Sequence, residues 1–333
     1  MYRAPGTGIN PEKRSRYEAG KTNGNTAEKE VMEDSESAPE LVRVLEGQRS
    51  IISALDFHPL KYQIVTANAD GSVGLWNVKP DTRAHRLIGH REVVLCVRYA
   101  KEGHILASGS RDKTIRIWIP GVRAESMMLA AHSGSVSAID YSTDGLSFVS
   151  CSHDKSIKIW DTRRFTFLTS YTGHSNWVNA VSYSPDNSIL LSGSSDGTIK
   201  SWSVKDNCCI RSYDSFGGAT RSVAYHPSGN YFAAAIEDGC VKVWDCRKHE
   251  LLQLYRVHDD ATTCVSFSPS GSHLLSSSAD STLKIMDAVE GHLIYTLYGH
   301  EGPVSFIRFA PTGKFFASAG SDERVLIWKT NFS

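Results

Sequence analysis

The feature that most constrains this chain is an internal repeat of 42 residues, which recurs seven times without insertion or deletion. Three positions keep this spacing in the same phase: one is always aspartate, one is most often histidine, and one is most often tryptophan. The aspartates are Asp70, Asp112, Asp154, Asp196, Asp238, Asp280 and Asp322; the histidine position is 48, 90, 132, 174, 216, 258 and 300; the tryptophan position is 76, 118, 160, 202, 244, 286 and 328. Counted back from Ser333, the seven units begin at Glu40.

A unit of this length predicts one four-stranded propeller blade. Short apolar runs over residues 94–99 and 105–108, and an alternating run over residues 114–118, indicate strands within the second unit. Asp70-Gly71 and its equivalents are signals for tight hairpins. Because a single blade cannot bury both of its faces, the blades must stack around a ring and share one core. The sequence therefore predicts an all-β, seven-bladed β-propeller over residues 40–333.

The start and the end of the repeat region are expected to pair with each other. Residues 41–46 align with residues 293–298, the strand that precedes Gly299-His300. Each repeat begins with this strand, so the last repeat lacks a strand at its outer edge. Residues 41–46 can fill that edge beside residues 324–329 and so close the ring, which limits exposed strand edges.

Residues 1–39 lie outside the repeat and are expected to form a flexible N-terminal tail. They are rich in Gly, Asn, Ser, Glu and Lys and poor in large apolar residues, so they cannot bury enough surface to offset the entropy of ordering. The first half is basic and the second half is acidic. Two interpretations stay open: a solvated tail, or a partner-binding arm that orders on contact.

Composition argues against several classes of function. Lys and Arg number 36, as do Asp and Glu, so no global field attracts nucleic acid. No apolar run approaches the roughly 18 residues of a membrane helix, and residues 1–16 do not resemble a signal peptide. The seven cysteines, an odd number without a C-x-x-C pair, favour a reduced, cytoplasmic protein.

The repeat resembles the WD40 family. Gly-His stands at 89–90, 173–174 and 299–300, and Trp-Asp at 160–161 and 244–245. In that family a hydrogen-bonded tetrad joins the Trp indole, a strand Ser or Thr, the His and the turn Asp. The resemblance implies structural tetrads in repeats two, four and seven: His90, Ser108, Asp112 and Trp118; His174, Ser192, Asp196 and Trp202; and His300, Ser318, Asp322 and Trp328.

Three repeats depart from the tetrad. In repeat five Phe216 replaces the histidine and Ala234 the serine, so both relay groups are lost together and no buried hydroxyl is left without a partner. Gln48 in repeat one is a milder change, because an amide both donates and accepts. Met286 removes the indole donor from repeat six, which is therefore expected to be the softer blade.

The chain is not expected to be an enzyme. Histidines of the tetrad position fall in five separate blades, which argues against a shared metal site. Ser, His and Asp occur together in each complete tetrad, but the Ser is a strand residue that serves the turn. We expect no catalytic residue, no metal, no cofactor and no small-molecule substrate. The five histidines are His90, His132, His174, His258 and His300.

On one face, the top face, each blade presents the residue before its turn Asp and the residue three after its histidine position. Trp177 is the only tryptophan outside the tetrad position, and Trp and Arg are favoured binding anchors. The alternative is that Trp177 only packs over the channel mouth. The predicted top-face protein-binding residues are Trp177, Arg111, His153, Asn179 and Arg221.

The opposite face is expected to hold the connections between blades. A basic arc over blades three to five could meet an acidic partner such as a tubulin surface. The alternative is scattered solvated charge, because Asp161, Asp206 and Asp245 lie among the basic residues. The predicted residues of this arc are Arg163, Arg164, Lys205, Arg247 and Lys248.

Within the WD40 proteins, the chain looks like the proteome-of-centriole WD-repeat family. The likeness lies in residues 109–118 (GSRDKTIRIW), 176–178 (NWV), 281–285 (STLKI) and 329–332 (KTNF). It implies a structural role in the cytoskeleton, at centrioles and ciliary basal bodies, where such proteins stabilise the microtubule wall by binding tubulin and other wall proteins. Members usually carry a C-terminal coiled-coil extension and a shorter N-terminal tail. The alternative is a generic WD40 adaptor for peptides in a chromatin or ubiquitin-ligase complex.

Overall fold

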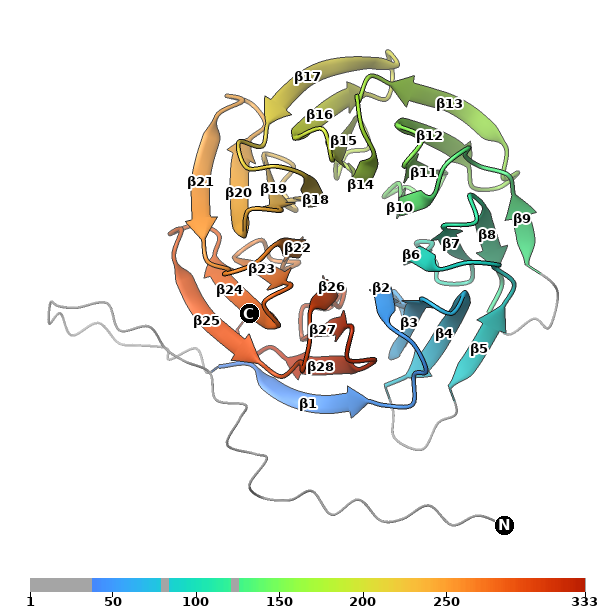
Figure 1. The fold of residues 1–333 in the computed structure, drawn as a ribbon. Helices are drawn as coiled ribbons and strands as arrows, with labels where there is room; N and C mark the ends of the chain where they lie inside the picture. Colours follow the sequence, from blue (N-terminus) through green and yellow to red (C-terminus); the bar gives the residue numbers. More distant parts are fainter. Residues whose placement is uncertain (1–37, 79–83, 121–125, 333) are drawn as a thin grey trace, which may run out of the picture.

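The computed structural model describes residues 38–78, 84–120 and 126–332. Within these ranges 28 strands form seven four-stranded antiparallel sheets, arranged as blades around a central opening (Figure 1). The predicted all-β, seven-bladed propeller is therefore confirmed. The expected flexible tail lies, up to residue 37, outside the described residues.

Every blade has the same four strand positions from the centre to the rim (Figure 1). The innermost strands are β2 (Ile52–Phe57), β6 (Val94–Tyr99), β10 (Val136–Tyr141), β14 (Val178–Tyr183), β18 (Thr220–Tyr225), β22 (Thr262–Phe267) and β26 (Val304–Phe309). The second strands are β3 (Gln63–Asn68), β7 (Leu106–Ser110), β11 (Ser147–Ser152), β15 (Ile189–Ser194), β19 (Tyr231–Ile236), β23 (His273–Ser278) and β27 (Phe315–Gly320). The third strands are β4 (Ser72–Asn77), β8 (Ile115–Trp118), β12 (Ser156–Asp161), β16 (Thr198–Ser203), β20 (Cys240–Asp245), β24 (Thr282–Asp287) and β28 (Val325–Lys329). The outermost strands are β5 (His85–Ile88), β9 (Met127–Leu129), β13 (Phe167–Thr172), β17 (Cys208–Asp214), β21 (Leu251–Arg256), β25 (Leu293–Tyr298) and β1 (Glu40–Leu45).

The ring closes as predicted. Strand β1 pairs antiparallel with β28, with Glu40 opposite Lys329 and Leu45 opposite Val325. Asn331 adds a second link, because its Nδ2 donates to the carbonyl oxygen of Ala38 at 2.9 Å. Strand β1 thus completes blade seven, whose other three strands come from the end of the repeat region (Figure 1).

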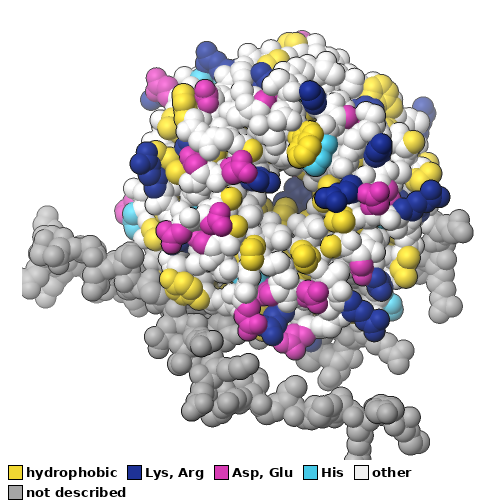
Figure 2. All heavy atoms as spheres, viewed as in Figure 1, with side chains coloured by type: hydrophobic (Ala, Val, Ile, Leu, Met, Phe, Trp, Pro, Cys, Tyr) yellow, Lys and Arg dark blue, Asp and Glu magenta, His cyan; other side chains and the backbone are white. Residues whose placement is uncertain are grey.

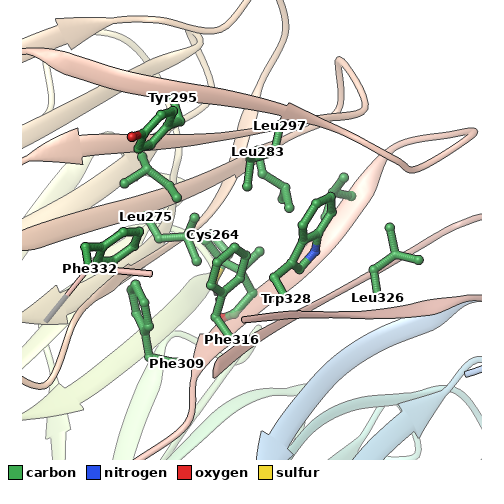
Figure 3. Packing of buried hydrophobic residues seen from close by; sticks show 13 residues of the cluster. Cys264, Leu275, Leu283, Tyr295, Leu297, Phe309, Phe316, Leu326, Trp328 and Phe332 are labelled. Atoms are coloured by element: carbon green, nitrogen blue, oxygen red, sulfur yellow. Dashed lines mark hydrogen bonds between the residues drawn. The ribbon is translucent and has the colours of Figure 1, made fainter. Parts of the chain in front are cut away.

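The core consists of apolar clusters that lie mainly in the seams between neighbouring blades. Figure 3 shows the cluster between blades six and seven, where Leu283 and Tyr295 face Phe316 and Trp328. The rings of Phe316 and Trp328 stack with centroids 5.9 Å apart. Because each blade shares its apolar side chains with its neighbours, burial stabilises the ring as a whole rather than blade by blade.

A β-bulge in each innermost strand adds polar links between blades. In three blades the side chain of the bulged residue donates to a carbonyl oxygen of the next blade, and one of these bonds runs from Ser137 Oγ to Val178 O. Asn179 Nδ2 donates to Thr220 O at 2.9 Å. Thr263 Oγ1 donates to Val304 O at 2.6 Å. These bonds hold neighbouring innermost strands in fixed register beside the channel.

Deleting residues 40–46 should open the ring. The loss of the β1–β28 ladder and of the buried Leu45 side chain is expected to lower Tm by roughly 10 °C, because it removes several kcal/mol of stability. Thermal denaturation followed by circular dichroism measures the effect. Leu45→Ala should reproduce part of the loss, whereas Val42→Ala, whose side chain is exposed, should not. An unchanged melting curve for the deletion would refute closure by β1.

Candidate protein-binding surfaces

A buried hydrogen-bond network connects the top loop of repeat four to its sheet. His174 Nδ1 lies 2.9 Å from Asp196 Oδ2, and His174 Nε2 lies 2.7 Å from Ser192 Oγ. Trp202 Nε1 donates to the same Ser192 oxygen at 2.8 Å. A carboxylate only accepts, so the proton sits on Nδ1 and Nε2 accepts from the serine. The imidazole is therefore neutral and every polar group in the chain of bonds has a partner.

The same three contacts occur in repeats two, three and seven, with distances of 2.8–3.1 Å. The structure thus brings together all three tetrads that the resemblance implied. The turn Asp also accepts the backbone N–H of the residue after the histidine, as Asp112 does from Arg91 at 3.1 Å. The tetrad therefore joins the loop between two blades to the hairpin turn of the second.

The environment shifts the pKa of both titratable tetrad members. Burial lowers the pKa of His174, although Asp196 opposes this shift. Burial alone would raise the pKa of Asp196, but hydrogen bonds from Thr198, His174 and the Ser175 backbone outweigh it and bring the pKa to about 2. Neutral histidine and ionised aspartate are thus the pair that the fold favours at neutral pH.

Repeat one holds the loosest network. Trp76 Nε1 donates to Thr66 Oγ1 at 3.2 Å, and Thr66 Oγ1 donates to Gln48 Oε1 at 3.3 Å. The Gln48 amide nitrogen is buried without a partner. Asp70, which would accept from a histidine, pairs instead with Arg86 from β5. The glutamine therefore does not relay to the turn, and the loop of repeat one is less firmly connected than its equivalents.

Repeat six keeps more of its network than expected. His258 Nε2 lies 2.7 Å from Ser276 Oγ, and its Nδ1 lies 3.0 Å from Asp280 Oδ2. Met286 is fully buried in an apolar cluster. Its thioether replaces the indole in packing, and the serine hydroxyl still has the histidine as its acceptor. Repeat six therefore lacks only the indole donor, whereas repeat one has an amide nitrogen, that of Gln48, without a partner.

Repeat five replaces the histidine contact with a lysine. Phe216 does not enter the histidine site: its side chain points outward and is 74% exposed. Lys242 from β20 is buried instead, donates to the carbonyl oxygen of Ser215, and lies 3.6 Å from Asp238 Oδ2. Ala234 is fully buried, as predicted for a blade that has lost both relay groups.

Three of the five predicted top-face residues come together. The rings of Trp177 and His153 stack with centroids 4.4 Å apart and an angle of 9°. Burial, reinforced by the charge of Arg111, lowers the pKa of His153, so the stacked imidazole is neutral. Trp177 is still 52% exposed, which leaves one ring face available. Figure 2 shows hydrophobic and charged side chains together around the central opening on one face of the propeller.

The other two top-face residues already have intramolecular partners. Both Nδ2 hydrogens of Asn179 are used, by Ser195 Oγ at 2.9 Å and by Thr220 O at 2.9 Å. Arg221 forms an ion pair with Glu237 at 2.5 Å. The candidate contact surface is therefore the trio of Arg111, His153 and Trp177, which spans blades two to four.

The basic residues of the opposite face lie in hairpin turns inside blades, which corrects the expectation that this face holds the connections between blades. Arg163 and Arg164 follow β12, in the turn before β13 of the same sheet. Asp161 accepts both of their backbone N–H groups, at 2.8 and 2.6 Å. Asp245 does the same for Arg247 and Lys248. These carboxylates are committed to the turns.

All five predicted residues of the arc are exposed: Arg163, Arg164, Lys205, Arg247 and Lys248. None of them has an ion pair among the residues that the structure describes. Asp161 and Asp245 accept hydrogen bonds from the turn backbone and Asp206 from the Ser203 hydroxyl, so the five cationic side chains stay free of direct ion pairs.

The central channel contains a charged ladder, a row of alternating cationic and anionic side chains, which the sequence analysis did not predict. The channel has a volume of about 740 Å³. Arg98 Nη2 lies 2.6 Å from Asp140 Oδ1, and Arg98 Nη1 lies 3.6 Å from Asp56 Oδ1. Arg308 reaches the same Asp56 oxygen at 3.2 Å. All four residues are 42 positions apart around the ring, so alternating charge at this spacing was the signal available in the sequence.

In residues 38–78, 84–120 and 126–332, no group of three or more His, Cys, Asp or Glu side chains is arranged to hold a metal ion. Across the same ranges, no helix has the length and apolar character needed to span a membrane.

Family comparison agrees with the geometry. The WD40 family (WD domain, G-beta repeat) matches residues 39–77, 82–118, 124–161, 165–203, 207–245, 249–287 and 291–329. The chain belongs to the WD40-repeat family. WD40 propellers act as scaffolds for protein interactions and are typically non-enzymatic, which agrees with a structural role for the histidines of this WD40 protein.

Two proteins of Danio rerio are similar to short segments of this WD40 chain. The chain is 46% identical to POC1 centriolar protein homolog A over 48 residues, which are 14% of this chain and 12% of that protein. It is 42% identical to POC1 centriolar protein homolog B over 56 residues, which are 17% of this chain and 11% of that protein. The matched part thus spans only a small fraction of each relative.

Ser192→Ala should destabilise the protein more than its size suggests. The substitution leaves the Trp202 indole and His174 Nε2 buried without a partner, at about 1–3 kcal/mol for each orphaned group. Chemical denaturation at neutral pH measures the change in the free energy of unfolding. Ser188→Ala, an exposed serine of the same blade, is the control and should change it little. Equal effects of the two substitutions would contradict a relay role for Ser192.

Stability should fall in acid, first through His174. The pKa of His174 in the folded protein lies below its ordinary value of 6.5, so the unfolded chain binds protons first as the pH falls. The contribution of this pKa shift to the free energy of unfolding is therefore fully present above pH 6.5, and it decreases as the pH falls below that value. Asp196, with a pKa of about 2 against 3.8, adds a second decline below pH 3.8.

Denaturation at a series of pH values tests the histidine contribution. His174→Gln should be less stable than the wild type at neutral pH and should show a smaller decline below pH 6.5. An unchanged slope would mean that His174 is not held neutral.

Proposed function

We propose that this protein is a non-enzymatic structural scaffold of centrioles and ciliary basal bodies, which binds and stabilises the microtubule wall through the faces of its propeller. The placement in the cell is supported by the partial similarity to the two POC1 centriolar protein homologs. The mode of action is supported by the WD40 propeller, a scaffold for protein interactions. Tubulin and other centriolar proteins are the proposed partners, in the cytoplasm and cytoskeleton.

The observation that carries a binding role for the top face is the exposed stack of Trp177 on His153. A half-exposed tryptophan fixed by a neighbouring ring offers a large, rigid contact area whose ordering has already occurred in the free protein. Arg111 places a cation beside this stack. The trio therefore suits a partner surface with an apolar or aromatic group next to a carboxylate.

The arc on the opposite face suits a different contact. Arg163, Arg164 and the other exposed cations of the arc form no close ion pair among the described residues, while the carboxylates of Asp161 and Asp245 hold the turns. An exposed, unpaired basic arc attracts an acidic surface and accelerates association, with a strength that falls as salt increases. The two faces together would let one disc bridge two wall components.

Imaging tests the proposed location. A fluorescently tagged protein should concentrate at centrioles or basal bodies, and a diffuse or purely nuclear signal would remove the centriolar assignment and favour a generic adaptor.

Co-sedimentation with microtubules tests the surfaces. Trp177→Ala should weaken binding by about 2 kcal/mol if the tryptophan is an anchor, whereas Trp177→Phe should keep part of the stack. The double change Arg163→Glu and Arg164→Glu should weaken binding most at low salt. If neither change reduces the sedimented fraction, both surface assignments are wrong.

A further inference from the structure

The top loop of repeat five borders a pocket of about 470 Å³ at the outer part of blade five. Its walls come from that loop, from the turn between β19 and β20, and from β20 and β21. This position lies apart from the trio of Arg111, His153 and Trp177. The lining residues are Phe216, Asp238, Gly239, Cys240, Lys242, Leu251, Leu254, Arg256 and His258.

The pocket occurs where the tetrad is missing. In repeat four His174 is buried and packs edge-on to Trp202, with ring centroids 5.9 Å apart. In repeat five the equivalent Phe216 is turned outward, and Ala234 contributes only a methyl group below it. Lys242 takes over the histidine contact beneath the loop, while Phe216, turned outward, forms one wall of the pocket. The histidine-to-phenylalanine change in repeat five thus supplies an apolar wall at the rim of one blade.

The loop that bounds the pocket is held in place without a histidine. The Phe216 backbone N–H donates to Asp214 Oδ1 at 2.8 Å. Gly217 passes so close to Asp238 that a Cβ atom would lie 1.9 Å from its Oδ2. Lys242 donates to the carbonyl oxygen of Ser215 from below. The pocket is therefore preformed, which lowers the entropic cost of binding a ligand.

The walls combine apolar surface with a positive charge. Phe216, Leu251 and Leu254 are large apolar side chains, each at least 40% exposed. Lys242 and Arg256 are two cations against one carboxylate, Asp238. Asp238 lies near Lys242, whereas Arg256 has no ion pair among the residues that the structure describes. The free charge in the pocket is therefore the guanidinium, beside two exposed leucines.

We propose that this pocket binds a short acidic–aromatic peptide segment of a partner protein. A Glu or Asp side chain would accept hydrogen bonds from the Arg256 guanidinium, with Lys242 adding to the positive field. A neighbouring Phe or Leu would pack between Phe216 and Leu254 and cover their exposed surface. A polyanion such as nucleic acid fits poorly, because phosphate binding needs a series of cations and the pocket offers one that is unpaired.

Fluorescence anisotropy with the full chain and defined peptides tests the proposal. The probe is a labelled peptide Ser-Glu-Phe-Glu-Glu-Ser; the matched peptides replace its Glu residues with Lys, or its Phe with Ala. The acidic aromatic peptide should bind, the basic peptide should not, and the Ala peptide should bind at least about tenfold more weakly. Absence of binding by the probe, or equal binding of the basic peptide, would overturn the proposal.

Two variants test whether the probe peptide binds in this pocket. Arg256→Glu should weaken the probe about tenfold or more, whereas Arg91→Glu, a charge-matched change at an exposed arginine of repeat two, should leave it unchanged. The double change Phe216→Ala and Leu254→Ala should remove two apolar walls of the pocket and weaken the probe about tenfold or more, with little change in Tm because both side chains are exposed. If the probe binds both pocket variants as it binds the wild type, it sits elsewhere and the proposal fails. The microtubule assay with Trp177→Ala is independent of this result.

Discussion

The arrangement of the top face depends on a hydroxyl group buried at the centre of each complete tetrad. Ser192 is fully buried and is the only group that can both accept from the Trp202 indole and donate to His174. Through the histidine it holds the turn aspartate, and through that aspartate the loop to the preceding blade. Exposed residues such as Trp177 sit only a few positions from these anchors. The surface that meets a partner is thus positioned from within the sheet.

Closure of the ring stabilises the propeller as a whole, whereas each tetrad stabilises one loop. Strand β1 gives blade seven its outermost strand, so the sequence repeat and the structural blade are offset by one strand. The offset joins neighbouring blades covalently and joins the ends of the chain through hydrogen bonds. In the channel the bonds from Asn179 and Thr263 and the ladder through Arg98 add cross-links near the axis. The blades are thus linked near the axis, through the apolar clusters between them and through the β1–β28 pairing. These links resist deformation of one blade alone, which suits a scaffold.

The period of 42 residues made the fold predictable, because it assigns every residue to a known place in a known unit. Ring closure follows from that assignment, and the complete tetrads follow from the resemblance to the WD40 family. The period says little about a position whose residue departs from the pattern. Phe216 turned outward instead of filling the histidine site, and Arg86 took the aspartate that Gln48 does not reach. Those outcomes depend on competition among side chains from different strands, which spacing does not encode. Arg163 was assigned to a connection between blades because the repeat boundary differs from the blade boundary.

Residues that depart from the repeat also make the blades distinguishable, so that a partner can recognise one rotational position of the ring. Seven identical blades would offer a partner seven equivalent positions, so recognition in a fixed register needs blades that differ. Trp177 distinguishes blade four, and the pocket beside Phe216 distinguishes blade five. Inside the channel the charged ladder lines blades seven, one, two and three, whereas the equivalent positions in blades four to six are Ser182, Ala224 and Ser266. Blades four and five are thus the sector where the top loops, the rim and the channel all depart from the pattern. A partner that contacts this sector can bind in only one rotational position on a nearly symmetric scaffold.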